Sequence, residues 1–173
     1  RDAKNLRHAI SSSFGFGGVN AHVIVEEYVS PEAAAPAAAV RPALVVLSAK
    51  SEERLKAQAS QLLAALERRA LGDAELADVA FTLQVGREAM EWRLAMIVGT
   101  MAQMQEKLQA YLAGVRQVED LYQGQARQHK DVLALFAGDE ELQDAVAKWI
   151  ERGKYGKLLE LWSRGLAFDW RRL

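Results

Sequence analysis

Short apolar runs and helical spacing alternate along residues 43–124. The runs ALVVLSA (43–49) and WRLAMIVG (92–99) have the length of buried strands, and VEDLYQG (118–124) is a weaker third. Apolar residues between the runs recur at helical spacing. Ser51 followed by two glutamates is typical of a helix start, because its hydroxyl and the early carboxylates satisfy the helix N-terminus. The pattern predicts an α/β (α+β) fold, with a small three-stranded sheet flanked by helices.

Short amphipathic units, each ended by a glycine, follow the third strand run and predict a helical C-terminal extension. One unit places Trp149 and Ile150 on a single face, and the last unit does the same with Leu158 and Trp162. We expect most of these four side chains to be buried, because each helix must cover a face, while some could form an interface with a neighbouring chain. The tail LAFDWRRL (166–173) alternates in character, which predicts an extended segment.

The head of the chain, residues 1–29, reads as two strand pieces around a glycine turn. After Asn20 the sequence AHVIV (21–25) is apolar on both faces of a strand until acidic residues end it. That pattern is typical of a strand buried on both sides. A head of this size cannot bury such a strand alone, so we expect it to belong to a sheet that other residues supply.

An alanine- and proline-rich segment separates the head from the body. All three prolines, Pro31, Pro36 and Pro42, lie within PEAAAPAAAVRP. Such a composition cannot form a packed core, so residues 30–42 are predicted to be a semi-extended linker before a body at 43–173.

Composition narrows the classes of function. The chain has 173 residues and a formal net charge of -1, which argues against a nucleic-acid partner because phosphate binding normally requires a basic excess. No apolar run reaches about 18 residues, so no membrane span is expected. The absence of cysteine excludes disulfides and thiolate chemistry within the chain and fits a cytoplasmic protein. The three histidines lack the spacing of metal ligands, so no metal is expected.

The loop SSSFGFGGVN carries the glycines Gly15, Gly17 and Gly18. A dinucleotide fingerprint needs another glycine where Asn20 stands, followed by a helix instead of a strand. A Walker loop needs a lysine and a serine or threonine, and a nucleophile elbow needs Gly-x-Ser-x-Gly; the loop has neither. The residues favour a tight backbone turn, although a turn alone leaves its two phenylalanines unexplained. His22 is read as a structural histidine in preference to a base, because no partner stands near it in the sequence.

Three stretches resemble one enzyme family. SSSFGFGGVNAHVIVEE (11–27) resembles the C-terminal signature of the β-ketoacyl synthase (ketosynthase) domain of modular polyketide synthases, with Val19 where threonine is usual. RPALVVLSAKSEERLKAQASQL (41–62) and ADVAFTLQVGREAMEWRLAMIV (77–98) resemble the flanking subdomain between ketosynthase and acyltransferase. The sequence 139–173 resembles the version found in synthases served by a separate, trans-acting acyltransferase.

The resemblance implies that residues 1–29 are the tail of a ketosynthase and residues 43–173 its flanking subdomain. The family catalyses a decarboxylative Claisen condensation with a cysteine and two histidines, none of which this chain contains. His22 matches neither histidine, so no catalytic residue and no cofactor is expected in the chain itself. The resemblance assigns Phe16 as a gate on the acyl pocket, with Gly15, Gly17 and Gly18 giving its loop mobility.

The resemblance also implies partners: the rest of the ketosynthase, an acyl carrier protein with its phosphopantetheine arm, and a trans-acting acyltransferase. Residues 129–165 are implied to mediate lateral contact between neighbouring synthases, which gives Trp149, Ile150, Leu158 and Trp162 a second role as candidate interface residues. The alternative is an independent carrier-docking or interaction module without catalytic function. A dinucleotide-binding enzyme is disfavoured by the strand after the loop.

Overall fold

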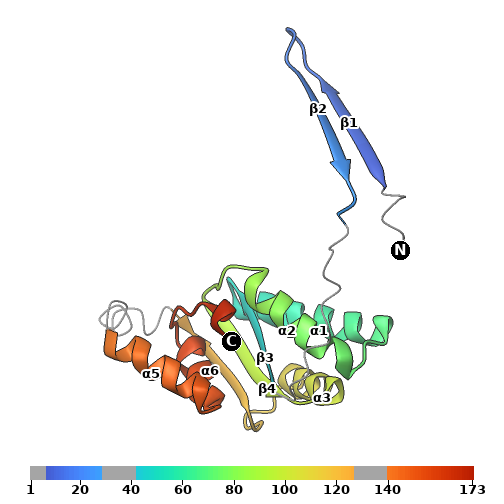
Figure 1. The fold of residues 1–173 in the computed structure, drawn as a ribbon. Helices are drawn as coiled ribbons and strands as arrows, with labels where there is room; N and C mark the ends of the chain where they lie inside the picture. The colour runs from blue at the N-terminus through green and yellow to red at the C-terminus, as the bar shows by residue number, and fades with distance from the viewer. Residues whose placement is uncertain (1–6, 29–41, 127–139) are drawn as a thin grey trace. The chain divides into compact units, whose positions relative to one another are not determined.

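The computed structural model describes residues 7–28, 42–126 and 140–173. The chain divides into two compact units, residues 1–38 and 39–173, and each is described by itself (Figure 1).

The first unit is a β-hairpin. β1 (His8–Phe14) pairs antiparallel with β2 (Asn20–Glu26), in a register that runs from His8 opposite Glu26 to Phe14 opposite Asn20. The two strand pieces around a glycine turn are therefore present. The expectation of a single leading strand without a partner is wrong, because the two halves of the head satisfy each other's backbone groups.

The second unit is built on the predicted three-stranded sheet. β3 (Ala43–Ala49), β4 (Trp92–Val98) and β5 (Leu121–Gln125) lie in the order β3-β4-β5, and both pairs are antiparallel. The third strand begins later than its sequence pattern indicated, because Asp120 has a φ of 55° and turns the chain just before Leu121.

One face of the sheet is covered by the helices that connect the strands. They are α1 (Glu52–Arg69), the 3₁₀ turn η1 (Asp73–Glu75), α2 (Leu76–Val85) and α3 (Met101–Leu112). Ser51 caps α1 as expected, since its Oγ accepts a hydrogen bond from the Arg54 amide at 3.3 Å. This layer and the inward side chains of β3 and β4 form the larger core, whose fully buried members include Val45, Leu55, Leu94, Met96, Met104 and Leu108.

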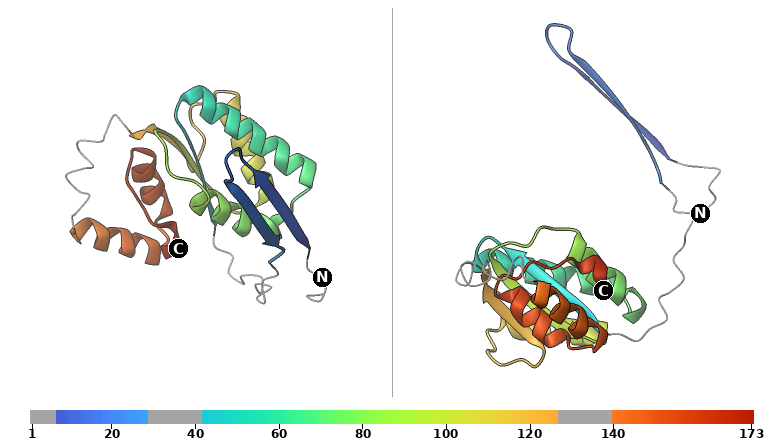
Figure 2. Two further views of the ribbon diagram at one scale, coloured as in Figure 1. Left: turned by 90° about the horizontal axis from the view of Figure 1, so that it is seen from above. Right: turned by 60° about the vertical axis from the view of Figure 1, so that its left-hand side comes forward.

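The C-terminal helices cover the opposite face of the sheet (Figure 2). They are α5 (Glu140–Glu151) and α6 (Tyr155–Ser163), followed by the 3₁₀ turn η3 (Trp170–Arg172). A second core lies here, made of Leu44, Val46, Ala95, Val146, Leu158, Leu159, Trp162, Leu166 and Trp170. The predicted α/β (α+β) class is confirmed.

Two details of the C-terminal end differ from the expectation. The helices form a complete second layer on the sheet instead of an appended extension, because β3 and β4 are apolar on both faces. The tail is not extended throughout, since Asp169 accepts a hydrogen bond from the Arg171 amide at 3.2 Å and starts η3. The helical unit KDVLALFAG lies outside the described residues. Within the described part, no helix is both long and apolar enough to cross a membrane.

Candidate functional site

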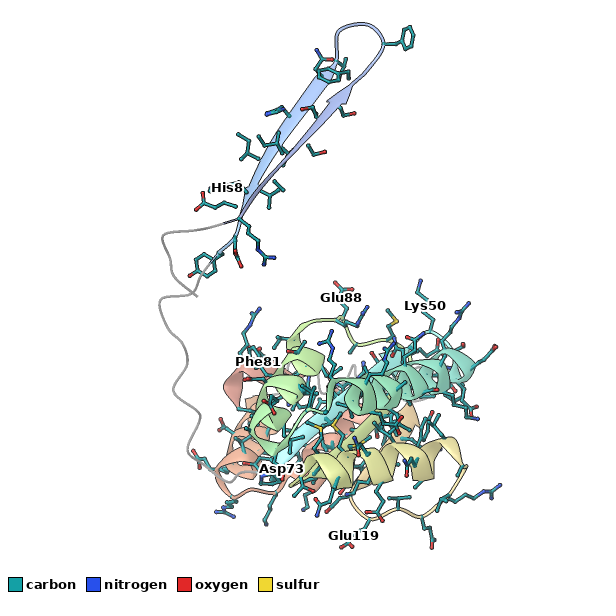
Figure 3. All side chains as sticks on the ribbon, turned by 90° about the vertical axis from the view of Figure 1, so that its right-hand side faces the viewer. His8, Lys50, Asp73, Phe81, Glu88 and Glu119 are labelled. Atoms are coloured by element: carbon teal, nitrogen blue, oxygen red, sulfur yellow. The ribbon has the colours of Figure 1, made fainter. Side chains whose placement is uncertain are left out.

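The hairpin presents apolar side chains on both of its faces. Directly paired residues share a face, so Ile10 and Ile24 lie on one side of the ribbon and Val23 and Val25 on the other. All four are more than half exposed, at 54–67%. Figure 3 shows side chains standing free on both sides of these strands. A lone two-stranded hairpin is marginally stable at best, and an apolar surface of this kind marks a place where other chain packs.

The glycine turn that closes the hairpin uses its glycines in two ways. The Gly15 amide donates to the Val19 carbonyl at 2.8 Å, and a Cβ on Gly15 would lie 2.7 Å from that same oxygen. Gly17 and Gly18 both have a φ of 87°, in the region that other residues rarely adopt. Phe16 lies in this turn with its side chain fully exposed. Its role as an acyl-pocket gate stays a prediction.

The hairpin also creates a serine–histidine contact that sequence reasoning missed. Ser12 and His22 lie directly opposite each other, and the Ser12 Oγ is 2.7 Å from the His22 Nδ1. Both side chains are exposed, and no hydrogen bond from a carboxylate to the His22 ring is present among the described residues. A nucleophilic serine needs a base that is itself oriented by a third group, so this pair is read as a cross-strand structural contact. Only the register of the strands could have revealed it.

The four candidate interface residues fall into two classes. Leu158 and Trp162 are 0% and 2% exposed and belong to the core beneath the sheet. Trp149 and Ile150 on α5 are half-buried and pack at the margin of that core. The Lys157 ammonium lies 6.0 Å from the centre of the Trp149 ring. Trp149 and Ile150 therefore keep exposed surface that a neighbouring chain could cover.

A buried arginine fastens the C-terminal layer to the sheet. Arg93 on β4 is 7% exposed, and its Nη1 donates to the carbonyls of Trp162 at 2.7 Å and Leu166 at 3.0 Å. Its Nε donates to the Met90 carbonyl at 2.9 Å, and the guanidinium lies 5.0 Å from the Trp162 ring centre. Burial lowers the pKa of Arg93 from its ordinary value. A cation at the C-terminus of α6 also complements the helix dipole.

The sequence carried one signal for this arrangement. Arg93 is a charge inside a run with the pattern of a buried strand, and such a charge needs partners. Its partners are main-chain carbonyls about seventy positions away, which no pattern in the sequence identifies.

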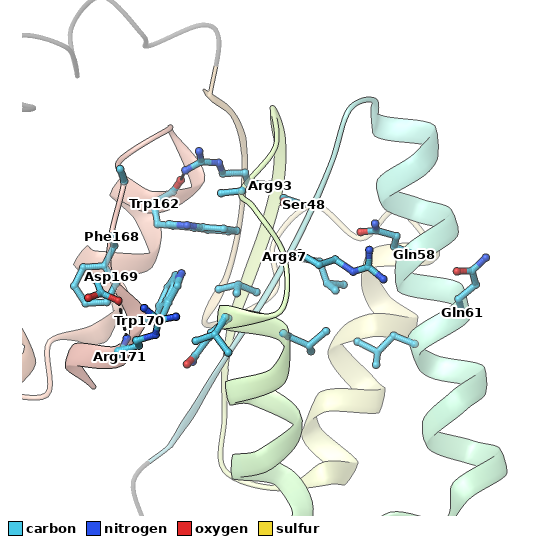
Figure 4. A pocket seen from close by; sticks show the side chains of 18 residues that line it. Ser48, Gln58, Gln61, Arg87, Arg93, Trp162, Phe168, Asp169, Trp170 and Arg171 are labelled. Atoms are coloured by element: carbon cyan, nitrogen blue, oxygen red, sulfur yellow. Dashed lines mark hydrogen bonds between the residues drawn. The ribbon is translucent and has the colours of Figure 1, made fainter. Parts of the chain in front are cut away.

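A pocket of about 610 Å³ opens beside Arg93 (Figure 4). Its walls come from both layers and from the strand between them: Gln58 and Gln61 of α1, Val46 to Ser48 of β3, Arg87 after α2, and Phe168 to Arg171 near the C-terminus. Three arginines line it, Arg87, Arg93 and Arg171, against a single carboxylate, Asp169. The arrangement suits binding and offers no nucleophile with its base.

Comparisons with known proteins agree on one kind of molecule. Residues 46–115 match the family described as RhiE-like, KS-MAT linker domain. The chain is 51% identical over 170 residues to polyketide synthase PksN of Bacillus subtilis (strain 168), covering 96% of this chain and 3% of that protein. It is 40% identical over 181 residues to polyketide synthase ThaG of Burkholderia thailandensis, covering 99% of this chain and 3% of that protein.

Solved structures with the same fold are ketosynthases. One is the ketosynthase from module 6 of the bacillaene synthase of Bacillus subtilis 168, with a TM-score of 0.71 and 35% identity over 100% of this chain and 29% of that one. Another is the ketosynthase from module 1 of the bacillaene synthase of Bacillus amyloliquefaciens, with a TM-score of 0.72 and 40% identity over 95% of this chain and 28% of that one. The chain thus spans a small part of each relative.

Proposed function

This chain belongs to the linker region that flanks the ketosynthases of polyketide synthases, and on that premise we propose that it holds a ketosynthase at a fixed position relative to its neighbouring domains. The parent enzyme is a polyketide synthase that performs decarboxylative Claisen condensation in the cytoplasm. Its substrates are carried on the phosphopantetheine arm of an acyl carrier protein. The chain contributes no catalytic residue to that reaction.

One observation carries this proposal: the two units differ in self-sufficiency. The body buries two cores, one on each face of its sheet. The hairpin leaves Ile10, Val23, Ile24 and Val25 exposed on both faces. Burying one such side chain contributes roughly 1.5–3 kcal/mol, so a partner sheet layer on each face would gain several kcal/mol. A hairpin inserted into the rest of the ketosynthase, joined to a rigid body, fits a part that positions domains.

The experiment is reconstitution of the ketosynthase from two pieces. The 173-residue chain and the remaining part of the ketosynthase are co-expressed, and the complex and its condensation activity are measured. We expect a complex that is lost in Val23→Glu and in Ile24→Glu, since each puts a charge on a different face of β2. Val115→Glu is the control, because Val115 is 52% exposed and lies in the body.

Two results would contradict the proposal. A chain that never associates with the ketosynthase, while remaining folded and binding a carrier protein, is the behaviour of an independent interaction module. Equal complex formation by the two β2 variants and Val115→Glu would separate the hairpin from the ketosynthase contact.

The gate role of Phe16 is a finer part of the same proposal. It is supported by the resemblance and by full exposure of the ring on a turn that only glycines allow. Phe16→Ala in the parent synthase is expected to change which acyl lengths are condensed while leaving its melting temperature within about 1–2 °C, because an exposed ring contributes little to stability. An unchanged acyl profile would remove the gate.

Lateral assembly, docking of the carrier and recruitment of a trans-acting acyltransferase complete the proposed partners. Deleting residues 129–165 is a poor test of assembly, because it removes core residues such as Leu158 and Trp162. Trp149→Glu in the full synthase is sharper, with the exposed neighbour Lys148→Glu as its control. We expect Trp149→Glu alone to shift sedimentation of the synthase to smaller species, and equal sedimentation of the two would refute lateral contact through α5.

A further inference from the structure

β3 is an edge strand, and half of its outer edge is covered. The amide Nε2 of Gln84 on α2 donates to the Leu44 carbonyl at 2.7 Å. This bond fixes which residues face outward, because N–H and C=O of one residue point the same way in an antiparallel strand and alternate along it. Leu44, Val46 and Ser48 therefore face away from β4. The register agrees: Ile97 lies opposite Leu44 and turns its own N–H toward β5, to the Asp120 carbonyl at 3.0 Å.

The other half of the edge is open. Within the described part of the chain, no hydrogen bond reaches the main-chain N–H or C=O of Val46 or Ser48 on the outer side. The Ser48 hydroxyl is engaged, since its Oγ accepts from the Met90 amide at 3.0 Å, but the Ser48 backbone is not. Open strand edges are normally covered or charged, because they recruit further strands.

The pocket beside Arg93 lies along this open half. Val46, Leu47 and Ser48 line it between residues of both layers, so the pocket straddles the edge of the sheet. In Figure 4 the side chains of Arg87 and Gln58 lie on one side and those of Phe168 and Trp170 on the other. Arg87 and Arg171 are exposed, and no ion pair engages either one among the described residues.

We propose that the open edge of β3 at Val46 and Ser48 binds an extended acidic peptide as a fourth strand of the sheet. The two residues offer main-chain donors and acceptors in the spacing that a strand requires. Alternate side chains of the peptide point to opposite layers, where Arg87 and Arg171 meet its carboxylates and Phe168 and Trp170 offer apolar contact. The proposal goes beyond the positioning role and does not depend on it.

The first experiment measures charge selectivity on the 173-residue chain. A fluorescein-labelled synthetic heptapeptide of alternating valine and glutamate is titrated by anisotropy, against the same peptide with lysine in place of glutamate. We expect the glutamate peptide to bind at least about tenfold more tightly, and Arg87→Glu with Arg171→Glu to remove that preference. Arg116→Glu, an exposed arginine in the loop before β5, is the matched control. Equal binding of both peptides, or equal loss in the control, overturns the proposal.

The second experiment tests the backbone itself by amide hydrogen exchange. We expect the Val46 and Ser48 amides to exchange fast in the free chain, while Val45 and Leu47 are protected by their bonds to β4. The glutamate peptide should slow the first pair at least about tenfold and leave the second pair unchanged.

Val46→Pro removes the outward N–H without breaking the ladder to β4, and Val46→Ala loses side-chain packing but keeps that N–H. Weaker peptide binding by the proline variant than by the alanine variant, with both folded by circular dichroism, supports strand addition. If the proline variant does not fold, the exchange experiment decides alone: unchanged exchange at Val46 and Ser48 under saturating peptide overturns the proposal.

Discussion

Replacing Arg93 removes the cation that joins α6 to the sheet. In Arg93→Ala the Leu166 carbonyl loses its donor inside a buried environment, whereas the Trp162 carbonyl keeps a second donor, the Gly165 amide at 3.0 Å. The Met90 carbonyl is half-buried, so water can replace the lost Nε there. The consequence is one stranded acceptor, one weakened acceptor and a lost contact with the Trp162 ring.

These losses give the magnitude. An unsatisfied buried carbonyl costs about 1–3 kcal/mol, and the second hydrogen bond about 1 kcal/mol. The cation–π contact adds about 0.5–1 kcal/mol, and relief from desolvating a buried guanidinium offsets part of the sum. We expect Arg93→Ala to lower the free energy of unfolding by about 2–4 kcal/mol. Arg93→Met keeps the packing of the aliphatic stem, so we expect it to cost less, but still about 1 kcal/mol or more.

The assay is urea unfolding of the 173-residue chain followed by tryptophan fluorescence. Trp162 and Trp170 pack edge to face at 5.7 Å between ring centres, so they report the C-terminal layer. Arg87→Ala is the control, since its side chain is exposed, and we expect a change within about 0.5 kcal/mol. If Arg93→Met is as stable as the wild type, the stranded carbonyl is not a cost and the account of this clamp is wrong.

Three further outcomes follow from other contacts. Burial and Glu52 raise the pKa of Tyr111 to about 12, so its stabilisation is complete below the unfolded pKa of about 10 and is lost as pH rises toward about 12; Tyr111→Phe should flatten the stability profile over that window in chemical denaturation. Gly124→Ala should lower the melting temperature by several degrees, because its Cβ would lie 2.6 Å from the Ser163 carbonyl. Asp73→Ala should cost about 1 kcal/mol in urea unfolding, since Asp73 Oδ1 accepts from the Met101 amide at 2.6 Å and caps α3 from outside its helix.

The elements that the sequence predicted well are those whose apolar pattern repeats. α1, α3 and the strands β3 and β4 follow their patterns, and the glycine turn of the hairpin stands where three glycines indicated it. The role of the C-terminal helices was harder to foresee. A helix pattern identifies its apolar face but not the surface that the face covers, and here that surface is the second apolar face of the sheet.

The candidate site was less predictable, because it depends on contacts between distant residues. The partners of Arg93 are two main-chain oxygens on the far side of the fold, and Ser12 meets His22 only through strand register. The pocket joins α1, β3 and the C-terminal segment, which lie far apart in the sequence. Side-chain types indicated that Arg93 needed partners, but only the fold identifies them.

The charge along the open edge of β3 also argues about which strand can add there. Two copies of this chain pairing through β3 would bring Arg87 and Arg171 of one copy against those of the other, with a single carboxylate, Asp169, in each pocket. Like charges at close range oppose such pairing, whereas an acidic strand gains from the same residues. The arginines therefore protect an open edge from self-association and favour a partner of opposite charge. Reversing both charges should weaken binding of the glutamate peptide and, because the repulsion pattern changes, bind the lysine peptide in its place.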